Sequence, residues 1–146
     1  MKLIPYLMFF NGDCRDAFEF YASALGGEIV SSITYGDMPP APDQPPMPEE
    51  AKAQIAHVNL VAGAASIMGG DSIMGLCGGE QVDGRNDTTV NIEVDTIEEA
   101  ERLFAALSAG GKVQMPLTET FWSQRFGMFE DRYGKPWMIN CNKPMP

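Results

Sequence analysis

The sequence predicts an α+β fold made of two βαβββ modules. Three observations carry this prediction: two helical segments that share one pattern, a strand-like run before each helix, and three extended runs after it. A four-stranded module with a single helix leaves one face of its sheet uncovered. We therefore expect the two modules to pack their sheets together, or one module to pack its sheet against a partner chain.

The two helical segments have the same spacing and the same end signals. Each carries apolar residues at i, i+3, i+7 and i+10, and the two sets lie 83 residues apart: Cys14, Ala17, Tyr21 and Ala24, then Ile97, Ala100, Phe104 and Leu107. We expect Asp13 and Asp95 to cap these helices and the pairs Gly26-Gly27 and Gly110-Gly111 to end them. The coincidence indicates an internal repeat.

The extended runs are rich in β-branched and aromatic residues. The predicted strands are Ile4–Phe10, Glu28–Tyr35, Ala53–Val61 and Ala65–Met68 in the first half, and Thr88–Val94, Lys112–Met115, Thr120–Gln124 continuing towards Phe129, and Pro136–Cys141 in the second. We expect one domain over residues 1–146, with module one at about 1–75, a glycine-rich linker at about 69–87 and module two at about 88–146. The proline-rich segment 36–48 predicts an extended surface loop.

Composition excludes several classes of protein. The chain of 146 residues has a formal charge of −10, which repels nucleic acid and anionic lipid. No apolar run reaches the roughly 18 residues of a membrane span. Cys14, Cys77 and Cys141 are too widely spaced for a metal motif, and their odd number favours reduced thiols. We expect a cytoplasmic protein with no nucleic-acid or membrane partner.

Two stretches carry a resemblance to a known family. The segment from Pro5 to Tyr21 resembles the first strand and helix of PhnB-like proteins, and the closing stretch is similar to their most distinctive part: Glu119–Trp122, Phe126-Gly127, Asp131–Gly134 and Pro136–Asn140. PhnB-like proteins belong to the vicinal oxygen chelate superfamily, the glyoxalase/bleomycin resistance/dihydroxybiphenyl dioxygenase fold. The resemblance implies cupped mixed sheets built from paired βαβββ modules, and a homodimer.

The resemblance also raises the question of a metal. The superfamily's metalloenzymes hold a divalent ion with four ligands, mostly His and Glu, from the first and last strands of each module. The corresponding positions here are Tyr6, a residue near Met68, Thr89 and Met138. None is a good donor for a hard cation, and a shift from Met68 to Asp71 does not supply the other donors. We expect no metal and no cofactor.

Some PhnB-like sequences are labelled ubiquinone methyltransferases. Methyl transfer from S-adenosylmethionine normally uses a glycine-rich turn after the first strand of a doubly wound sheet, and no such unit is visible in this sequence. We do not expect that activity.

The candidate catalytic residues are His57 and Glu119. His57 shares a strand face with Asn59, where the polar pair can bind or deprotonate a ligand, although a hydrogen-bonded structural histidine is the simpler interpretation. Glu119 lies near Trp122, and an aromatic wall raises the pKa of a carboxyl group towards that of a base. The alternative is a solvated Glu119 or an ion pair with Arg125.

The candidate ligand-binding residues are Tyr6, Tyr35, Asn59, Trp122 and Met138. Tyrosine hydroxyls orient ligands in otherwise apolar pockets, and methionines adapt a pocket to its ligand, although both also fill cores. The first hypothesis is a protein that binds a small apolar or aromatic oxygenated molecule in its cup without the usual metal site. The alternative is a small-molecule lyase or isomerase that uses His57 and Glu119. A third reading, in which the dimer surface is itself the function, ranks last.

Overall fold

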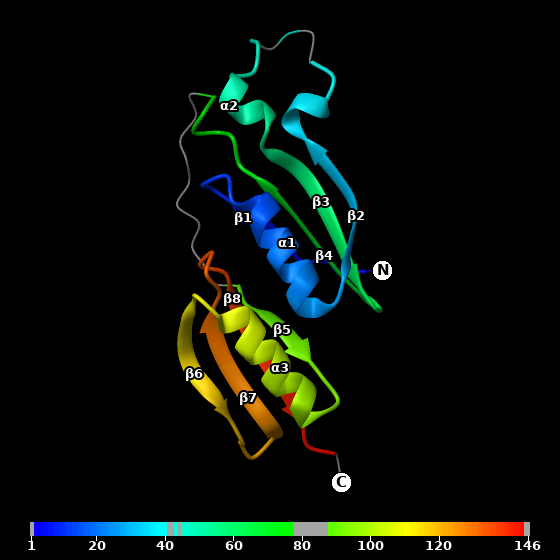
Figure 1. The fold of residues 1–146 in the computed structure, drawn as a ribbon, viewed down its shortest axis with the longest axis vertical. Coiled ribbons are helices and arrows are strands. Elements are labelled where there is room, and N and C mark those ends of the chain that lie inside the picture. Colours follow the sequence, from blue (N-terminus) through cyan, green and yellow to red (C-terminus); the bar gives the residue numbers. More distant parts are fainter. Residues whose placement is uncertain (1, 41–42, 44, 78–87, 145–146) are drawn as a thin grey trace. The chain divides into compact units, whose positions relative to one another are not determined.

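The computed structural model describes residues 2–40, 43, 45–77 and 88–144. Its elements in chain order are β1 (Tyr6–Phe9), α1 (Cys14–Leu25), β2 (Glu28–Thr34), the 3-10 turn η1 (Tyr35–Asp37), α2 (Glu49–Lys52), β3 (Ile55–Ala62), β4 (Ala65–Asp71), β5 (Val90–Glu93), α3 (Ile97–Ser108), β6 (Lys112–Thr118), β7 (Ser123–Glu130) and β8 (Pro136–Asn142) (Figure 1). The predicted α+β architecture and the order βαβββ in each half are confirmed.

The chain divides into two compact units, Met1–Gly84 and Arg85–Pro146. The first contains a four-stranded sheet with the order β1-β4-β3-β2, here called sheet A, and the second contains sheet B, with the order β5-β8-β7-β6. In both sheets the first and last strands of the module pair in parallel and the other neighbours are antiparallel. The two units therefore share one topology, as the internal repeat predicts. The division of the sequence into one domain with two modules stays a prediction.

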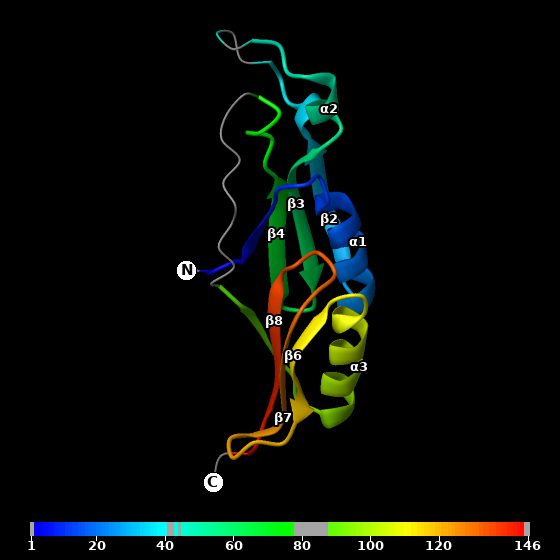
Figure 2. The ribbon, with the colours of Figure 1, turned by 90° about the vertical axis from the view of Figure 1, so that its left-hand side faces the viewer.

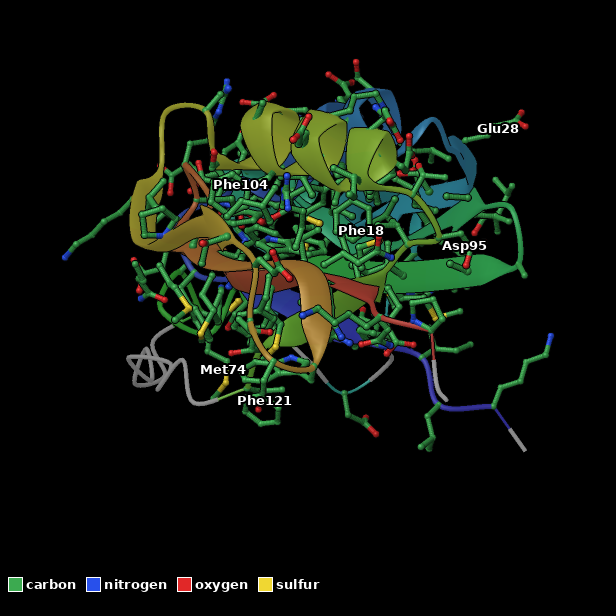
Figure 3. All side chains as sticks on the ribbon, turned by 90° about the horizontal axis from the view of Figure 1, so that it is seen from below. Phe18, Glu28, Met74, Asp95, Phe104 and Phe121 are labelled. Carbon is green, nitrogen blue, oxygen red and sulfur yellow. The ribbon has the colours of Figure 1, made fainter. Side chains whose placement is uncertain are left out.

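Each long helix lies on one side of its own sheet (Figure 2). In unit 1, the buried face of α1 consists of Cys14, Ala17, Phe18, Tyr21 and Ala24. In unit 2, α3 buries Ala100, Leu103 and Leu107. Phe104, which is labelled in Figure 3, meets Phe129 of β7 edge to face at 5.1 Å. One face of each sheet is thus covered by apolar contacts that stabilise the unit.

The helix caps differ from those predicted. Thr96, not Asp95, caps α3, because its side chain accepts a hydrogen bond from the Glu99 backbone N–H. Asp13 precedes α1 but makes no capping bond with its side chain. The buried carboxylate of Asp71 accepts from the Cys14 N–H at 3.1 Å instead. A residue distant in the sequence thus satisfies the first turn of the helix.

Strand β4 extends to Asp71, so its predicted end at Met68 is wrong, and Gly69 to Asp71 belong to the sheet rather than to a linker. A Cβ at Gly69 would lie 2.6 Å from the Phe18 ring, which explains a glycine inside the strand. Glycine often marks the end of a strand, but Gly69 instead allows β4 to pack closely against α1. The rest of the predicted linker, residues 78–87, lies outside the described residues, as do 41, 42 and 44 of the proline-rich segment.

The closing stretch contains the motif D-x-x-G-x-x-W, here Asp131, Gly134 and Trp137, which spans the turn between β7 and β8. Asp131 Oδ1 accepts hydrogen bonds from the Tyr133 and Lys135 N–H groups at 2.8 and 3.0 Å, and Oδ2 accepts from Trp137 Nε1 at 2.8 Å. Gly134 adopts a φ of +78°, which favours glycine. Because Asp131 and Trp137 are both buried, the signature has a structural function.

Among the described residues, no helix is long and apolar enough to cross a membrane. All three cysteines lie in the described part of the chain and form no disulfide there; Cys14 and Cys141 are buried and Cys77 is exposed. The burial of Cys14 agrees with its predicted place on the apolar face of the first helix.

Candidate functional site: two helix-free sheet faces

The side of sheet A that α1 leaves uncovered is called the helix-free face of sheet A. One row of residues in register crosses its four strands: Tyr6, Met68, Asn59 and Ser31. The next residue of β4, Gly69, faces Phe18 of α1, so by strand alternation this row faces away from the helix. The predicted residues Tyr6 and Asn59 therefore lie on one face, on β1 and β3, with Met68 of β4 between them.

Tyr6 and His57 form a stacked polar pair on this face. Their rings stack at a centroid distance of 5.7 Å, and Tyr6 Oη lies 3.4 Å from His57 Nδ1. The phenol lies over Gly70, where a Cβ would come within 3.0 Å of Tyr6 Oη. Burial raises the pKa of Tyr6, so its hydroxyl stays protonated at neutral pH. The pair can therefore offer a ligand an aromatic surface with a hydroxyl and an imidazole beside it.

The other two predicted residues of unit 1 also make internal hydrogen bonds. Asn59 Oδ1 accepts from Ser66 Oγ at 2.9 Å on the neighbouring strand. Tyr35 lies in η1, where its hydroxyl donates to the Asp71 carbonyl oxygen at 2.6 Å, and burial raises its pKa. The Tyr35 proton is thus engaged by the backbone. Tyr6 Oη lies 3.4 Å from the Ala56 carbonyl oxygen and 3.4 Å from His57 Nδ1.

The side of sheet B opposite α3 is called the helix-free face of sheet B. A row of three methionines, with an asparagine at one end, crosses its strands in register: Asn91, Met138, Met128 and Met115. Gly127, next to Met128, lies against Phe104 of α3, so the row faces away from the helix. Flexible thioether side chains give this face an adaptable apolar surface.

Aromatic side chains continue the same face towards the turn between β6 and β7. Trp122 meets Phe126 edge to face at 5.4 Å, and Phe121 meets Trp122 at 4.7 Å. Phe121 is 88% exposed and lies on the opposite side of sheet B from α3 (Figure 3). The predicted Trp122 and Met138 thus occupy one face, together with Phe126 and Met128, which the sequence analysis did not select. Period-two alternation could have identified these residues, because Phe126, Met128 and Met138 alternate along their strands with residues that are buried.

Glu119 does not have the environment expected of a base. Its Oε1 lies 2.8 Å from Lys143 Nζ, and this ion pair lowers the pKa of Glu119. The expected raised pKa is therefore wrong, because the Glu119 carboxylate is exposed and the Lys143 ammonium stabilises its charge. The predicted partner was Arg125, whereas Arg125 pairs with Glu101 at 3.7 Å. His57 and Glu119 belong to different units.

The residues at the superfamily's ligand positions do not fit a hard divalent cation. Tyr6 pairs with Met68 and Asn91 pairs with Met138, while Thr89 precedes β5. Phenol and thioether groups are poor donors for such an ion, and one amide oxygen alone does not hold it. Both carboxylate oxygens of Asp71 are engaged by backbone N–H groups, of Cys14 and of Ile55. Within the described ranges, no group of three or more His, Cys, Asp and Glu side chains is placed to hold a metal ion.

Comparison with known proteins identifies the family. The model of the Glyoxalase/Bleomycin resistance protein/Dioxygenase superfamily matches residues 3–139. The chain therefore belongs to this superfamily, whose fold the two βαβββ units display.

Particular relatives place the chain more narrowly. It is 36% identical to the protein YjdN of Escherichia coli over 100% of this chain and 99% of YjdN. It is 40% identical in sequence to protein PA1353 from Pseudomonas aeruginosa. The crystal structure of PA1353 matches with a TM-score of 0.83, and 99% of both chains is covered. A PhnB protein from Bacillus cereus, described as a putative 3-demethylubiquinone-9 3-methyltransferase, is 25% identical, with a TM-score of 0.74 and coverage of 97% and 99%. The resemblance to PhnB-like proteins is confirmed.

Proposed function

We propose that this PhnB-like protein binds a small apolar or aromatic oxygenated molecule on its helix-free sheet faces, without the superfamily's usual metal site. The observation that carries the proposal is the composition of the helix-free face of sheet B. Three methionines share one row there, and Phe126 and Trp122 extend it. Ligand sites typically combine such apolar surface with a few placed polar groups.

The helix-free face of sheet A supports the same proposal. Tyr6 and His57 place a hydroxyl and an imidazole beside apolar side chains, of which Met8 is 38% exposed. A ligand oxygen needs such groups to be oriented, and the surrounding apolar area supplies the driving force for binding.

Two measurements test the proposal together. Elemental analysis of gently purified, untagged protein should find no stoichiometric zinc, nickel, manganese or iron, and metal titration should add none. A thermal-melting screen should then find aromatic oxygenated compounds that raise the melting temperature with increasing concentration. Stoichiometric metal, or no shift with any apolar or aromatic compound, would contradict the proposal.

The second candidate function is a small-molecule lyase or isomerase. The contact between Tyr6 and His57 favours it, since a hydroxyl beside an imidazole is suited to proton transfer. Glu119, whose pKa is lowered by Lys143, is a weaker base than a carboxylate with a raised pKa. If an activity is found, His57→Ala should abolish it, whereas an unchanged rate in both His57→Ala and Glu119→Gln would exclude this assignment.

We also propose a cytoplasmic homodimer. The resemblance to PhnB-like proteins supports the dimer, and three cysteines that form no disulfide support the location. Light scattering coupled to gel filtration should give twice the chain mass of 15.9 kDa. A monomer mass at micromolar concentration would contradict the dimer.

A further inference from the structure

A chain of amide side chains crosses the helix-free face of sheet B. Glu93 of β5 pairs in register with Asn140 of β8, and Asn140 pairs with Phe126 of β7. Asn142 Nδ2 donates to Glu93 Oε1 at 3.1 Å, and Asn140 Nδ2 donates to Asn142 Oδ1 at 2.7 Å. The chain therefore runs from an exposed carboxylate to a buried amide.

The carboxylate of Glu93 fixes the direction of this chain. A carboxylate only accepts, so Asn142 must present its NH₂ group to Glu93 and its carbonyl oxygen to Asn140. Asn140 must then present its own NH₂ group to Asn142. The Asn140 carbonyl oxygen is then the last atom of this series of hydrogen-bonded side chains.

This oxygen is a buried acceptor. Asn140 is 9% exposed, and its Oδ1 has no hydrogen-bond partner among the described residues. A buried acceptor without a partner is unfavourable, and native structures usually supply one. The residue beside it on β7, Phe126, contacts Trp122 edge to face, so an acceptor lies next to an aromatic surface.

We infer that Asn140 Oδ1 accepts a hydrogen bond from the ligand and selects aromatic molecules that carry an O–H or N–H donor. This inference rests on the proposed function and narrows its ligand class to phenol-like and arylamine-like compounds. An aromatic ketone or ether of the same size places an oxygen, rather than a proton, against Asn140 Oδ1. Such compounds bind more weakly.

The test uses three neutral probes of similar size: 2-naphthol, 2-methoxynaphthalene and 2-acetylnaphthalene. Isothermal titration calorimetry on the full chain should give a Kd for naphthol roughly tenfold or more below that of the other two, the usual range for one buried hydrogen bond. Equal affinities for all three would overturn this inference and leave the proposed function standing. No binding of any probe would overturn both.

Two variants separate recognition from a structural effect. Asn140→Leu should bring the naphthol Kd to that of methoxynaphthalene, whereas Gln114→Leu, on the exposed edge strand β6, should keep the preference. Glu93→Gln lets the amide chain reverse, because glutamine both donates and accepts. It should strengthen acetylnaphthalene binding severalfold and methoxynaphthalene binding less, because an aryl ether oxygen is a weaker acceptor than a ketone oxygen. A naphthol preference that persists in Asn140→Leu would refute the inference. If that variant fails to fold, equal affinities of the three probes for the unmodified protein would still refute it.

Discussion

Replacing Asp131 by asparagine tests the structural reading of the closing signature. The amide oxygen of the new side chain can keep the bonds from the Tyr133 and Lys135 N–H groups, but its NH₂ group then faces Trp137 Nε1, itself a donor. One charged hydrogen bond to the buried indole N–H is therefore lost. We expect Asp131→Asn to destabilise the fold by about 1.5–3 kcal/mol.

The effect is measured by urea unfolding and by melting. For a chain of this length, about 2 kcal/mol corresponds to a decrease of roughly 4–8 °C in Tm. A double-mutant cycle with Trp137→Phe isolates the bond, since the cavity made by losing the larger ring cancels in the cycle. If Asp131→Asn costs the same with and without Trp137, the coupling is zero and the reasoning fails.

Three further predictions concern Gly69, Asp71 and Glu119. A Cβ at Gly69 would lie 2.6 Å from the Phe18 ring, so Gly69→Ala should lower the free energy of unfolding by about 1–3 kcal/mol; an unchanged urea midpoint would contradict the packing argument. Burial raises the pKa of Asp71 above 3.8. Its contribution to stability is therefore present below the unfolded-state pKa and is lost as the pH rises through the folded-state pKa. NMR titration of the Asp71 carboxyl should give a pKa above 3.8, and a lower pKa would refute this. Lys143 lowers the pKa of Glu119, so this ion pair contributes stability above the unfolded-state pKa, and the contribution is lost as the pH falls through the folded-state pKa. The small difference in urea midpoint between wild type and Glu119→Gln should therefore vanish in acid. A difference that persists in acid would exclude the ion pair as its cause.

The sequence by itself determined the order of elements. Both long helices begin and end within a residue of their predicted positions because an apolar face at helical spacing and a terminal glycine are local signals. The strands that were predicted too short, β4 and β6, contain glycine or proline, which locally indicate a turn. The family signature was also readable, since it depends on residue identity alone.

The candidate site depended on the tertiary structure. Tyr6 meets His57, and Lys143 meets Glu119, across distances in the sequence that no local pattern reports. In the sequence Asn140 is one polar residue in an apolar strand. Only the folded sheet shows that its amide bonds to Asn142, and that its carbonyl oxygen has no partner among the described residues. Register and burial decide which partner a polar atom finds, and those are properties of the folded sheet rather than of the segment.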